Sequence, residues 1–397
     1  MTDYDFTTIV REVGIKENIP DCTLDLKYST NKGDGYLGTV QAVQLVGKGK
    51  KLDVVFKFSH RNPKSHESLP LRDVYLNEVK FYEEIIPAFT KLQLENHIED
   101  GFDNVPKFYG SIKEPLNELL VLENLKVSDY DLWDRKKLMN KEHLEFALKT
   151  FAKFHGTSYA MQKINPKMYE KITESMKDDV FLRFVIKMGF TAQIQGGIKK
   201  IVNIFDSVKE KKYIDALTKF GETLPKEMEA ILTFHEADVI LQGDCWCNNG
   251  MYHYDSKDHT KPNDMKMLDF QLMRLGSPAL DLSYFFYTIS PKESYENLEY
   301  FLKVYHDALG KHLAKFNLKV EEIYPYKTFK QHWEKLSKFG LVLSFLIRKA
   351  MLTESEDAPD ITEGDFLANM YVNPEKERLY HQQMKDLIIH FVDSKFV

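Results

Sequence analysis

Cysteine is scarce in this sequence, with three residues in 397: Cys22, Cys245 and Cys247. An odd, sparse set in a chain of this length is not a disulfide framework, and it indicates a reducing compartment. Residues 1–9 are polar and acidic and lack the apolar stretch of a secretory signal. We therefore expect a cytoplasmic protein.

Long apolar runs and an excess of basic residues are also missing. The most apolar stretches, near 280–289 and 341–347, fall far short of the roughly 20 residues that a membrane helix needs. Lys and Arg total 54 against 60 Asp and Glu, so the net charge is −6, and this balance does not call for a nucleic-acid partner. The sequence thus predicts no membrane insertion and no nucleic-acid binding, and no obligate protein partner is evident.

The composition that remains is that of a folded protein. Hydrophobic residues make up 43% and charged residues 29%, which excludes the disordered and fibrous classes. The segment 22–60 has β-type alternation, whereas 73–89 carries an apolar stripe at helical spacing. Most of the rest is helical, apart from a β-rich island at about 238–271. We therefore predict an α+β protein of two lobes, a small β-rich lobe over 1–124 and a large, mainly helical lobe over 125–397.

A glycine motif lies in the small lobe. Gly33, Gly35 and Gly38 match the pattern G-x-G-x-x-G, which opens a helix in dinucleotide-binding folds. Here a β-branched, strand-like run, 39–45, follows it instead. Glycines between two strands form a hairpin, which is either an ordinary turn or a loop whose backbone lies over nucleotide phosphates, as in kinases. The segment alone leaves both interpretations open.

Two charged residues of the small lobe stand at apolar positions. Lys57 lies inside the apolar run 54–58. Its side chain lies either on the solvent-exposed face of an edge strand or in an inward position, where it needs an anionic partner. Glu78 shares a helical stripe with Tyr75 and Tyr82, where a carboxylate is costly without a cation. A strand lysine followed by an inward helix glutamate holds the ATP phosphates in kinases. We therefore predict that Lys57 and Glu78 form an ion pair in a nucleotide site.

The β-rich island of the large lobe carries the residues expected to perform chemistry. Asp244 and Asn249 have the Asp-x4-Asn spacing of a kinase catalytic loop, in which the aspartate accepts the alcohol proton and the amide oxygen binds magnesium. Asp269 follows 25 residues after Asp244, directly behind an apolar run, as a metal-binding aspartate at a strand end does. Mg²⁺ prefers oxygen ligands and keeps waters, so one carboxylate, one amide and two phosphates suffice. We predict Asp244 as the catalytic base and Asn249 and Asp269 as metal ligands.

Six segments together carry a resemblance to a known family: 78–82, 105–110, 122–125, 242–249, 269–272 and 276–282. They resemble the insect ecdysteroid-kinase-like family, which belongs to the choline-kinase and aminoglycoside-phosphotransferase-like small-molecule kinases. The resemblance covers nearly the whole chain. It implies a two-lobe, protein-kinase-like fold with ATP and Mg²⁺ in the cleft.

The resemblance also implies roles for individual residues. Glu123 and Leu125 would offer backbone groups to adenine, and Asp281 would buttress the catalytic loop by accepting its backbone N–H groups. One departure stands out, because Gln242 occupies the position where the family usually has histidine. That histidine is expected to orient the loop, and glutamine can still donate a hydrogen bond.

The same segments favour a small alcohol over a peptide as the acceptor. Gln271 stands where protein kinases have glycine, and only eleven residues separate Asp269 from Asp281, too few for a peptide-docking segment. The apolar helical segments 170–235 and 325–372 would form the acceptor wall and favour a lipophilic alcohol, such as an ecdysteroid or a xenobiotic. The alternatives are a choline- or ethanolamine-type kinase and a non-catalytic pseudokinase that binds a small molecule.

Overall fold

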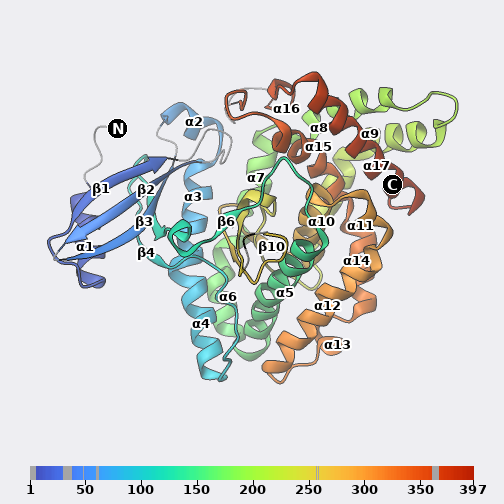
Figure 1. Ribbon diagram of the computed structural model, residues 1–397. Coiled ribbons are helices and arrows are strands. Elements are labelled where there is room, and N and C mark those ends of the chain that lie inside the picture. Colours follow the sequence, from blue (N-terminus) through green and yellow to red (C-terminus); the bar gives the residue numbers. More distant parts are fainter. Residues whose placement is uncertain are drawn as a thin grey trace.

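The computed structural model describes residues 6–29, 38–47, 49–59, 62–255, 257, 259–359 and 366–397. Its N-terminal part is built on one five-stranded antiparallel sheet, with the strand order β1-β2-β3-β5-β4. The bounds are β1 Thr23–Ser29, β2 Gly38–Gly47, β3 Lys50–Ser59, β4 Phe108–Ile112 and β5 Leu119–Glu123. The sheet stands at one side of the molecule and the helices fill the other (Figure 1).

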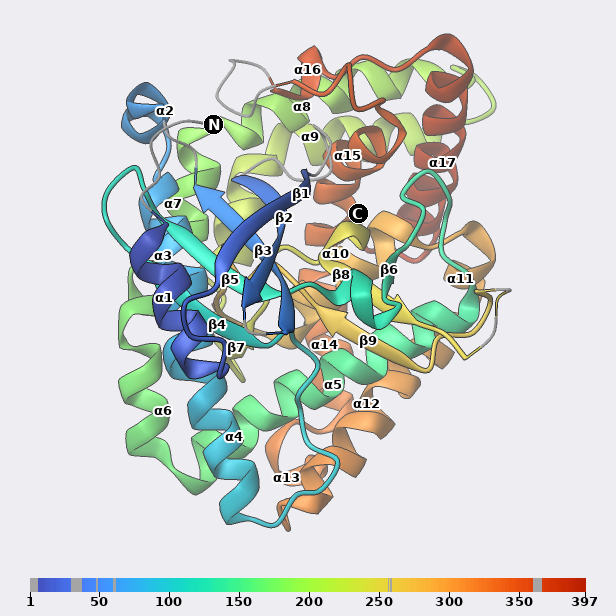
Figure 2. The ribbon, with the colours of Figure 1, turned by 60° about the vertical axis from the view of Figure 1, so that its left-hand side comes forward.

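One face of this sheet is covered by helix α1, Thr7–Lys16. Ile9 and Val13 of α1 are buried against Val54 and Phe56 of β3, in a core of aliphatic and aromatic side chains. Figure 2 brings the sheet forward, with α1 beside it. Because the apolar residues of β3 alternate, the opposite face receives the other set of side chains, which includes Lys57.

A continuous helical segment runs between the sheet and the larger helical part (Figure 1). The short α2, Pro63–Ser68, precedes α3, Leu71–Lys80, and α3 continues through one π-helical turn, Phe81–Ile85, into α4, Ile86–Glu95. The stripe expected from the sequence is confirmed, since Tyr75, Val79 and Tyr82 are all buried. The hydroxyl of Tyr75 donates to the backbone carbonyl of Lys57, which ties α3 to β3.

The C-terminal part is mainly helical. Its helices are α5 Lys141–Ile164, α6 Pro166–Thr173, α7 Val180–Lys187, α8 Phe190–Ile201, α9 Lys211–Leu232, α10 Pro278–Ile289, α11 Lys292–Glu296, α12 Leu298–Lys315, α13 Val320–Ile323, α14 Tyr326–Leu336, α15 Lys338–Leu352, α16 Phe366–Asn369 and α17 Pro374–Asp393. Helix α10 is buried along its whole length, and α15 lies directly on it. That approach requires a glycine, since a Cβ at Gly340 would lie 2.1 Å from the carbonyl oxygen of Ser283.

Two small sheets hold the loops that carry the predicted chemistry. Strand β7, Val239–Leu241, pairs with β10, Arg274–Gly276, while β6, Asp131–Leu132, β8, Gly250–His253, and β9, Asp264–Met267, form a three-stranded sheet. The loop 242–249 leaves β7 and enters β8, and the loop 268–273 joins β9 to β10. Because β7 pairs with β10 and β8 with β9, the two loops are held at both ends against each other.

The predicted class, an α+β fold with a small β-rich part and a large helical part, is confirmed. The division at residue 124 stays a prediction. Within the described ranges, no helix combines the length and the apolar character needed to cross a bilayer.

Candidate active site

Lys57 and Glu78 form the predicted ion pair. The Lys57 Nζ lies 2.6 Å from Glu78 Oε2 and 2.9 Å from Asp269 Oδ1, so it bridges carboxylates from α3 and from the loop after β9. The exposed fractions of the Lys57 and Glu78 side chains are 10% and 1%. The interpretation of Lys57 as a residue on the solvent-exposed face of an edge strand is therefore wrong. Its ammonium group lies where the sheet, α3 and the loop that carries Asp269 meet.

The electrostatics of this pair follow from its burial. Burial alone would lower the pKa of Lys57, but the negative charges of Asp269 and Glu78 outweigh it and raise this pKa above its ordinary value. Burial raises the pKa of Glu78, and the ammonium of Lys57 opposes that rise. Lys57 is thus held as a cation, the form that binds phosphate oxygens.

Helix α3 is fixed to the loop that follows Asp269. The amide nitrogen of Asn77 donates to the carbonyl oxygens of Gln271, at 3.1 Å, and Met273, at 2.7 Å. One turn along, the ring of Phe81 stacks on Phe270 with a centroid distance of 3.4 Å. The helix that carries Glu78 is therefore held in its paired position by contacts within the chain itself.

The predicted catalytic loop, 242–249, carries near its start a glycine that its geometry requires. Gly243 has φ +84°, and a Cβ there would lie 2.0 Å from the carbonyl oxygen of Leu272. The buried carboxylate of Asp281, at the start of α10, accepts the N–H groups of Gln242 at 2.7 Å and of Gly243 at 3.1 Å. The backbone contacts that the family resemblance implied for Asp281 are present.

Gln242, which stands in place of the family histidine, connects the two loops. Its Oε1 accepts the N–H of Asp244 at 2.8 Å, while its Nε2 donates to the carbonyl oxygens of Leu268 and Asp269, both at 2.9 Å. The Gln242 side chain is buried and these three bonds are partly buried, so an unpaired polar group would be costly there. Glutamine therefore supplies both a donor and an acceptor at this position.

We expect Gln242→Ala to lower turnover of ATP by roughly 10- to 100-fold, because several hydrogen bonds between the loops are lost and their polar partners stay buried. Gln242→His should keep most of the activity, since a histidine can retain a donor to the carbonyl groups. ADP release from MgATP measures both variants. Gln93→Ala is the matched control, because Gln93 is a buried glutamine whose amide bonds to Phe102, away from both loops. Equal losses in Gln242→Ala and Gln93→Ala would contradict the prediction.

Asp244, Asn249 and Asp269 meet where the two loops face each other. The Asn249 Nδ2 donates to the Asp244 backbone oxygen at 2.8 Å and to its carboxylate Oδ2 at 3.0 Å. The amide nitrogen is thus used within the loop, and the amide oxygen is left to act as a ligand. Asp269 has φ +58°, a left-handed conformation that is uncommon outside glycine and that turns its carboxylate toward Lys57.

This donor set suits a hard cation. An amide oxygen and a carboxylate line the same cavity, and Mg²⁺ is bound in proteins by one or two carboxylates together with waters and substrate phosphates. Among the described residues, no group of three or more His, Cys, Asp or Glu side chains is placed to hold a metal without such help. Asn249 and Asp269 therefore fit Mg²⁺ that arrives with a nucleotide.

The Asp244 carboxylate has an altered pKa. Burial and the nearby charge of Asp269 raise it to about 6, against the opposing effect of hydrogen bonds from Tyr284 and Asn249. The hydroxyl of Tyr284 donates to Asp244 Oδ1 at 2.7 Å. A carboxylate with a pKa near 6 is a stronger base than an ordinary aspartate and is still mostly ionised at neutral pH.

Two cavities share Asn249 and Asp269. The first, about 220 Å³, lies under the sheet and is lined by Lys57, Glu78 and the 122–126 segment, among others. The second, about 110 Å³, contains Asp244. Its other walls are apolar side chains from α7, α8, α15 and α16, which fall within the two segments expected to form the acceptor wall. Asn249 and Asp269 thus stand at the boundary between the cleft under the sheet and an apolar chamber that contains Asp244.

The residues expected around a nucleotide line the first cavity in part. Glu123 and Leu125 both contribute, as does Gly38 at the start of β2, whereas Gly33 and Gly35 lie outside the described residues. The N–H of Glu123 is donated to the Lys107 oxygen at 2.8 Å, so any contact with adenine falls to its carbonyl oxygen. Leu125 begins a short 3₁₀ helix, Leu125–Ser128, where the first N–H groups have no partner within the helix.

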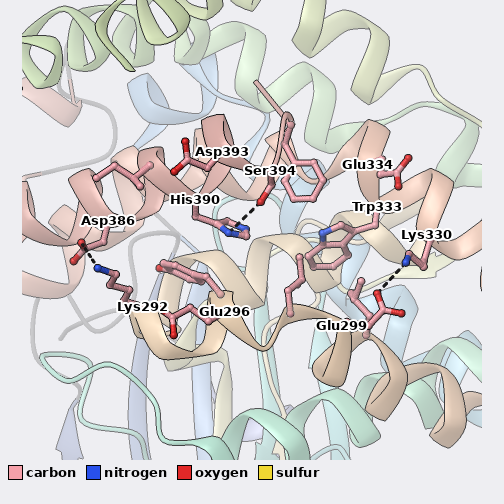
Figure 3. Close-up of a pocket in the computed structure, with 15 residues that line it drawn as sticks. Lys292, Glu296, Glu299, Lys330, Trp333, Glu334, Asp386, His390, Asp393 and Ser394 are labelled. Carbon is pink, nitrogen blue, oxygen red and sulfur yellow. Dashed lines mark hydrogen bonds and ion pairs between the residues drawn. The ribbon is translucent and has the colours of Figure 1, made fainter. Parts of the chain in front are cut away.

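A further cavity lies elsewhere. It measures about 530 Å³ and opens between α11, α12, α14 and α17 (Figure 3). Its walls carry ion pairs between Lys330 and Glu299, at 3.0 Å, and between Lys292 and Asp386, at 3.7 Å. Asp244 does not line this cavity. Size alone therefore does not point to the candidate active site, which is selected by the convergence of Lys57, Asp269 and Asp244.

Sequence reasoning missed two residues of this site, Asn77 and Tyr284. Tyr284 could have been found, since it follows Asp281 by three positions, one helical turn, and so shares the face of α10 that meets the catalytic loop. No pattern in the sequence could have predicted the role of Asn77, because its hydrogen-bond partners lie nearly 200 positions away.

Comparisons with known proteins place the chain among relatives. Residues 32–318 match the model of the ecdysteroid kinase-like family. Among curated proteins, no sequence matches the chain. Solved structures similar to it include an aminoglycoside 2'-phosphotransferase in complex with GDP, at 13% identity over 96% of each chain with a TM-score of 0.45. Another is a spectinomycin phosphotransferase in complex with ADP and spectinomycin, at 9% identity over 96% of this chain and 95% of that chain, with a TM-score of 0.42.

Proposed function

The chain belongs to the ecdysteroid kinase-like family of small-molecule kinases, and we propose that it transfers the γ-phosphoryl group of ATP to a hydroxyl of a small apolar alcohol, such as an ecdysteroid or a xenobiotic. One observation carries this proposal. Asp244 lies in an apolar chamber that shares Asn249 and Asp269 with the cleft containing Lys57. An acceptor in the chamber and a nucleotide in the cleft would meet at these residues.

The chamber favours an apolar acceptor over a compact cation. Most of its wall is aliphatic or aromatic, with Phe181, Phe184 and Leu343 as examples, and its carboxylates are already engaged. Asp269 pairs with Lys57, and Asp244 accepts hydrogen bonds on both oxygens. The volume of about 110 Å³ is less than a typical ligand pocket of roughly 300–1,000 Å³. A bulky alcohol therefore enters with its reacting end, and the remainder extends outward or displaces side chains.

The residues of the cleft account for nucleotide binding in this proposal. Lys57 binds the phosphate oxygens, and Glu78 keeps it oriented and charged. The residues that would hold Mg²⁺ are Asp269 and Asn249, and the ion supplies positive charge that neutralises phosphate oxygens. Gln242 keeps the loops that carry these ligands in register through its bonds to both.

Asp244 acts on the acceptor. It orients the hydroxyl and accepts its proton as the hydroxyl oxygen attacks the γ-phosphorus. A new oxygen–phosphorus bond forms, the bond between the γ-phosphorus and its bridging oxygen breaks, and ADP leaves with that electron pair. The apolar wall excludes water, which would otherwise compete as the acceptor.

A panel assay tests this function. The purified chain is incubated with MgATP and a set of steroids, plant phenols and terpenoid alcohols, together with choline and ethanolamine, and the products are analysed by mass spectrometry for added phosphate. We expect phosphorylation of apolar alcohols that is absent in Asp244→Asn. Phosphorylation of choline or ethanolamine alone would overturn the proposal that the acceptor is an apolar alcohol. Wild-type activity in Asp244→Asn would overturn the assignment of Asp244 as the catalytic base.

A further inference from the structure

We propose that Tyr284 is a positioning residue, which holds the Asp244 carboxylate in the orientation that faces the acceptor; this inference rests on the proposed function. The two side chains come from different elements, since Asp244 lies in the loop after β7 and Tyr284 lies in α10. The Tyr284 hydroxyl donates to Asp244 Oδ1 at 2.7 Å. Both residues line the apolar chamber.

The Asp244 carboxylate is held from two sides. Asn249, within the same loop, donates to Oδ2, and Tyr284, from outside the loop, donates to Oδ1. Each carboxylate oxygen has a second lone pair, so a hydroxyl in the chamber can still be accepted. With one donor on each oxygen, rotation of the carboxylate would break at least one hydrogen bond. The intraloop bond alone would leave Oδ1 free to turn.

Helix α10 gives this contact a rigid support. Asp281 and Tyr284 lie three positions apart, on one face of the helix, and they engage the backbone and the reacting side chain of the same loop. The ring of Tyr284 packs edge-on against Phe339 of α15, with centroids 6.2 Å apart. The same face of α10 therefore fixes the loop and aims its carboxylate.

The chemical character of Tyr284 suits a permanent donor. Its side chain is 2% exposed, and burial together with the charge of Asp244 raises the pKa of its hydroxyl well above the ordinary value. The group therefore keeps its proton under all working conditions. A phenylalanine at this position would fill the same space without the hydrogen bond, which makes the substitution a clean test.

The test compares Tyr284→Phe with Tyr287→Phe. Tyr287 lies on the same buried helix, and its hydroxyl contacts His390 Nε2 at 3.1 Å instead of the catalytic loop. The probe is ADP formation from MgATP in the presence of the steroids, plant phenols and terpenoid alcohols of the panel. We expect Tyr284→Phe to lower kcat roughly tenfold with an unchanged KM for ATP, and Tyr287→Phe to leave both values unchanged.

A double variant separates positioning from general support of the fold. In the Asp244→Asn background, Tyr284→Phe should cause no further loss, because the group that it positions is no longer a base. A loss that is equal in both backgrounds, or an unimpaired Tyr284→Phe, would overturn the role of Tyr284. A wild-type chain that transfers phosphate from MgATP to none of the alcohols of the panel would instead overturn the proposed function.

Discussion

Replacing Asp244 by asparagine should cut turnover by roughly 10²–10⁴-fold, the usual contribution of acid–base catalysis, and leave ATP binding nearly unchanged. The asparagine keeps the size of the side chain and can accept the hydrogen bond from Tyr284, but it cannot take the proton of the alcohol. An aliphatic hydroxyl does not ionise before attack, so the proton acceptor must be present as the oxygen–phosphorus bond forms. Nucleotide titration and timed product formation measure the two effects separately.

Asp264 offers a matched control for this prediction. Its carboxylate also accepts hydrogen bonds from a tyrosine hydroxyl, that of Tyr130, and from an asparagine amide, that of Asn104. It lines neither the cleft nor the apolar chamber. Asp264→Asn should therefore keep turnover near the wild-type level. A fall of less than about tenfold in Asp244→Asn on an accepted alcohol would mean that Asp244 is not the base.

Asp269→Ala should abolish Mg²⁺-dependent phosphoryl transfer and leave the fold intact. The substitution removes the only carboxylate of the predicted metal pair, and Asn249 alone presents a single neutral oxygen to the ion. Lys57 still has Glu78 as a partner at 2.6 Å, so the buried ammonium is not left uncompensated. Phosphate transfer with increasing Mg²⁺, and the thermal unfolding temperature, measure the two parts of this prediction.

The comparison variant for the metal site is Asp264→Ala, which removes a half-buried carboxylate from the neighbouring strand β9. It should retain Mg²⁺-dependent transfer. If Asp269→Ala transfers phosphate at the wild-type Mg²⁺ dependence, the ion is bound elsewhere. Unfolding of Asp269→Ala at a temperature well below that of Asp264→Ala would show that Asp269 also supports the fold.

Much of the site could be predicted because its chemistry is encoded in short spacings. The Asp-x4-Asn pattern fixes Asp244 and Asn249 in one loop, and the structure joins them by a direct hydrogen bond. Lys57 and Glu78 could be paired because each is a charge at an apolar position, and such charges need each other. The β-rich and helical parts followed from apolar periodicity, which depends only on neighbours along the chain.

The remaining contacts join residues that are distant in sequence and carry no repeat pattern. The bond from Asn77 to Gln271 spans 194 positions, and the bond from Tyr284 to Asp244 spans 40. The Gln242 side chain makes three hydrogen bonds, one within its own loop and two to the neighbouring loop. These bonds depend on the pairing of β7 with β10, which brings the two loops together. Such contacts arise from how the elements pack, and a single sequence does not contain that information in any local form.

A crystal structure of the chain with Mg²⁺, a non-hydrolysable ATP analogue and an apolar alcohol from the panel tests the account most directly. The account predicts phosphates on Lys57, the ion between Asp269 and Asn249, Glu78 still paired with Lys57, and the alcohol hydroxyl in hydrogen-bond contact with the Asp244 carboxylate. Two results would contradict the account. One is a Glu78 side chain turned to solvent, and the other is an alcohol bound in the cavity beside Trp333 with no hydroxyl bound at Asp244.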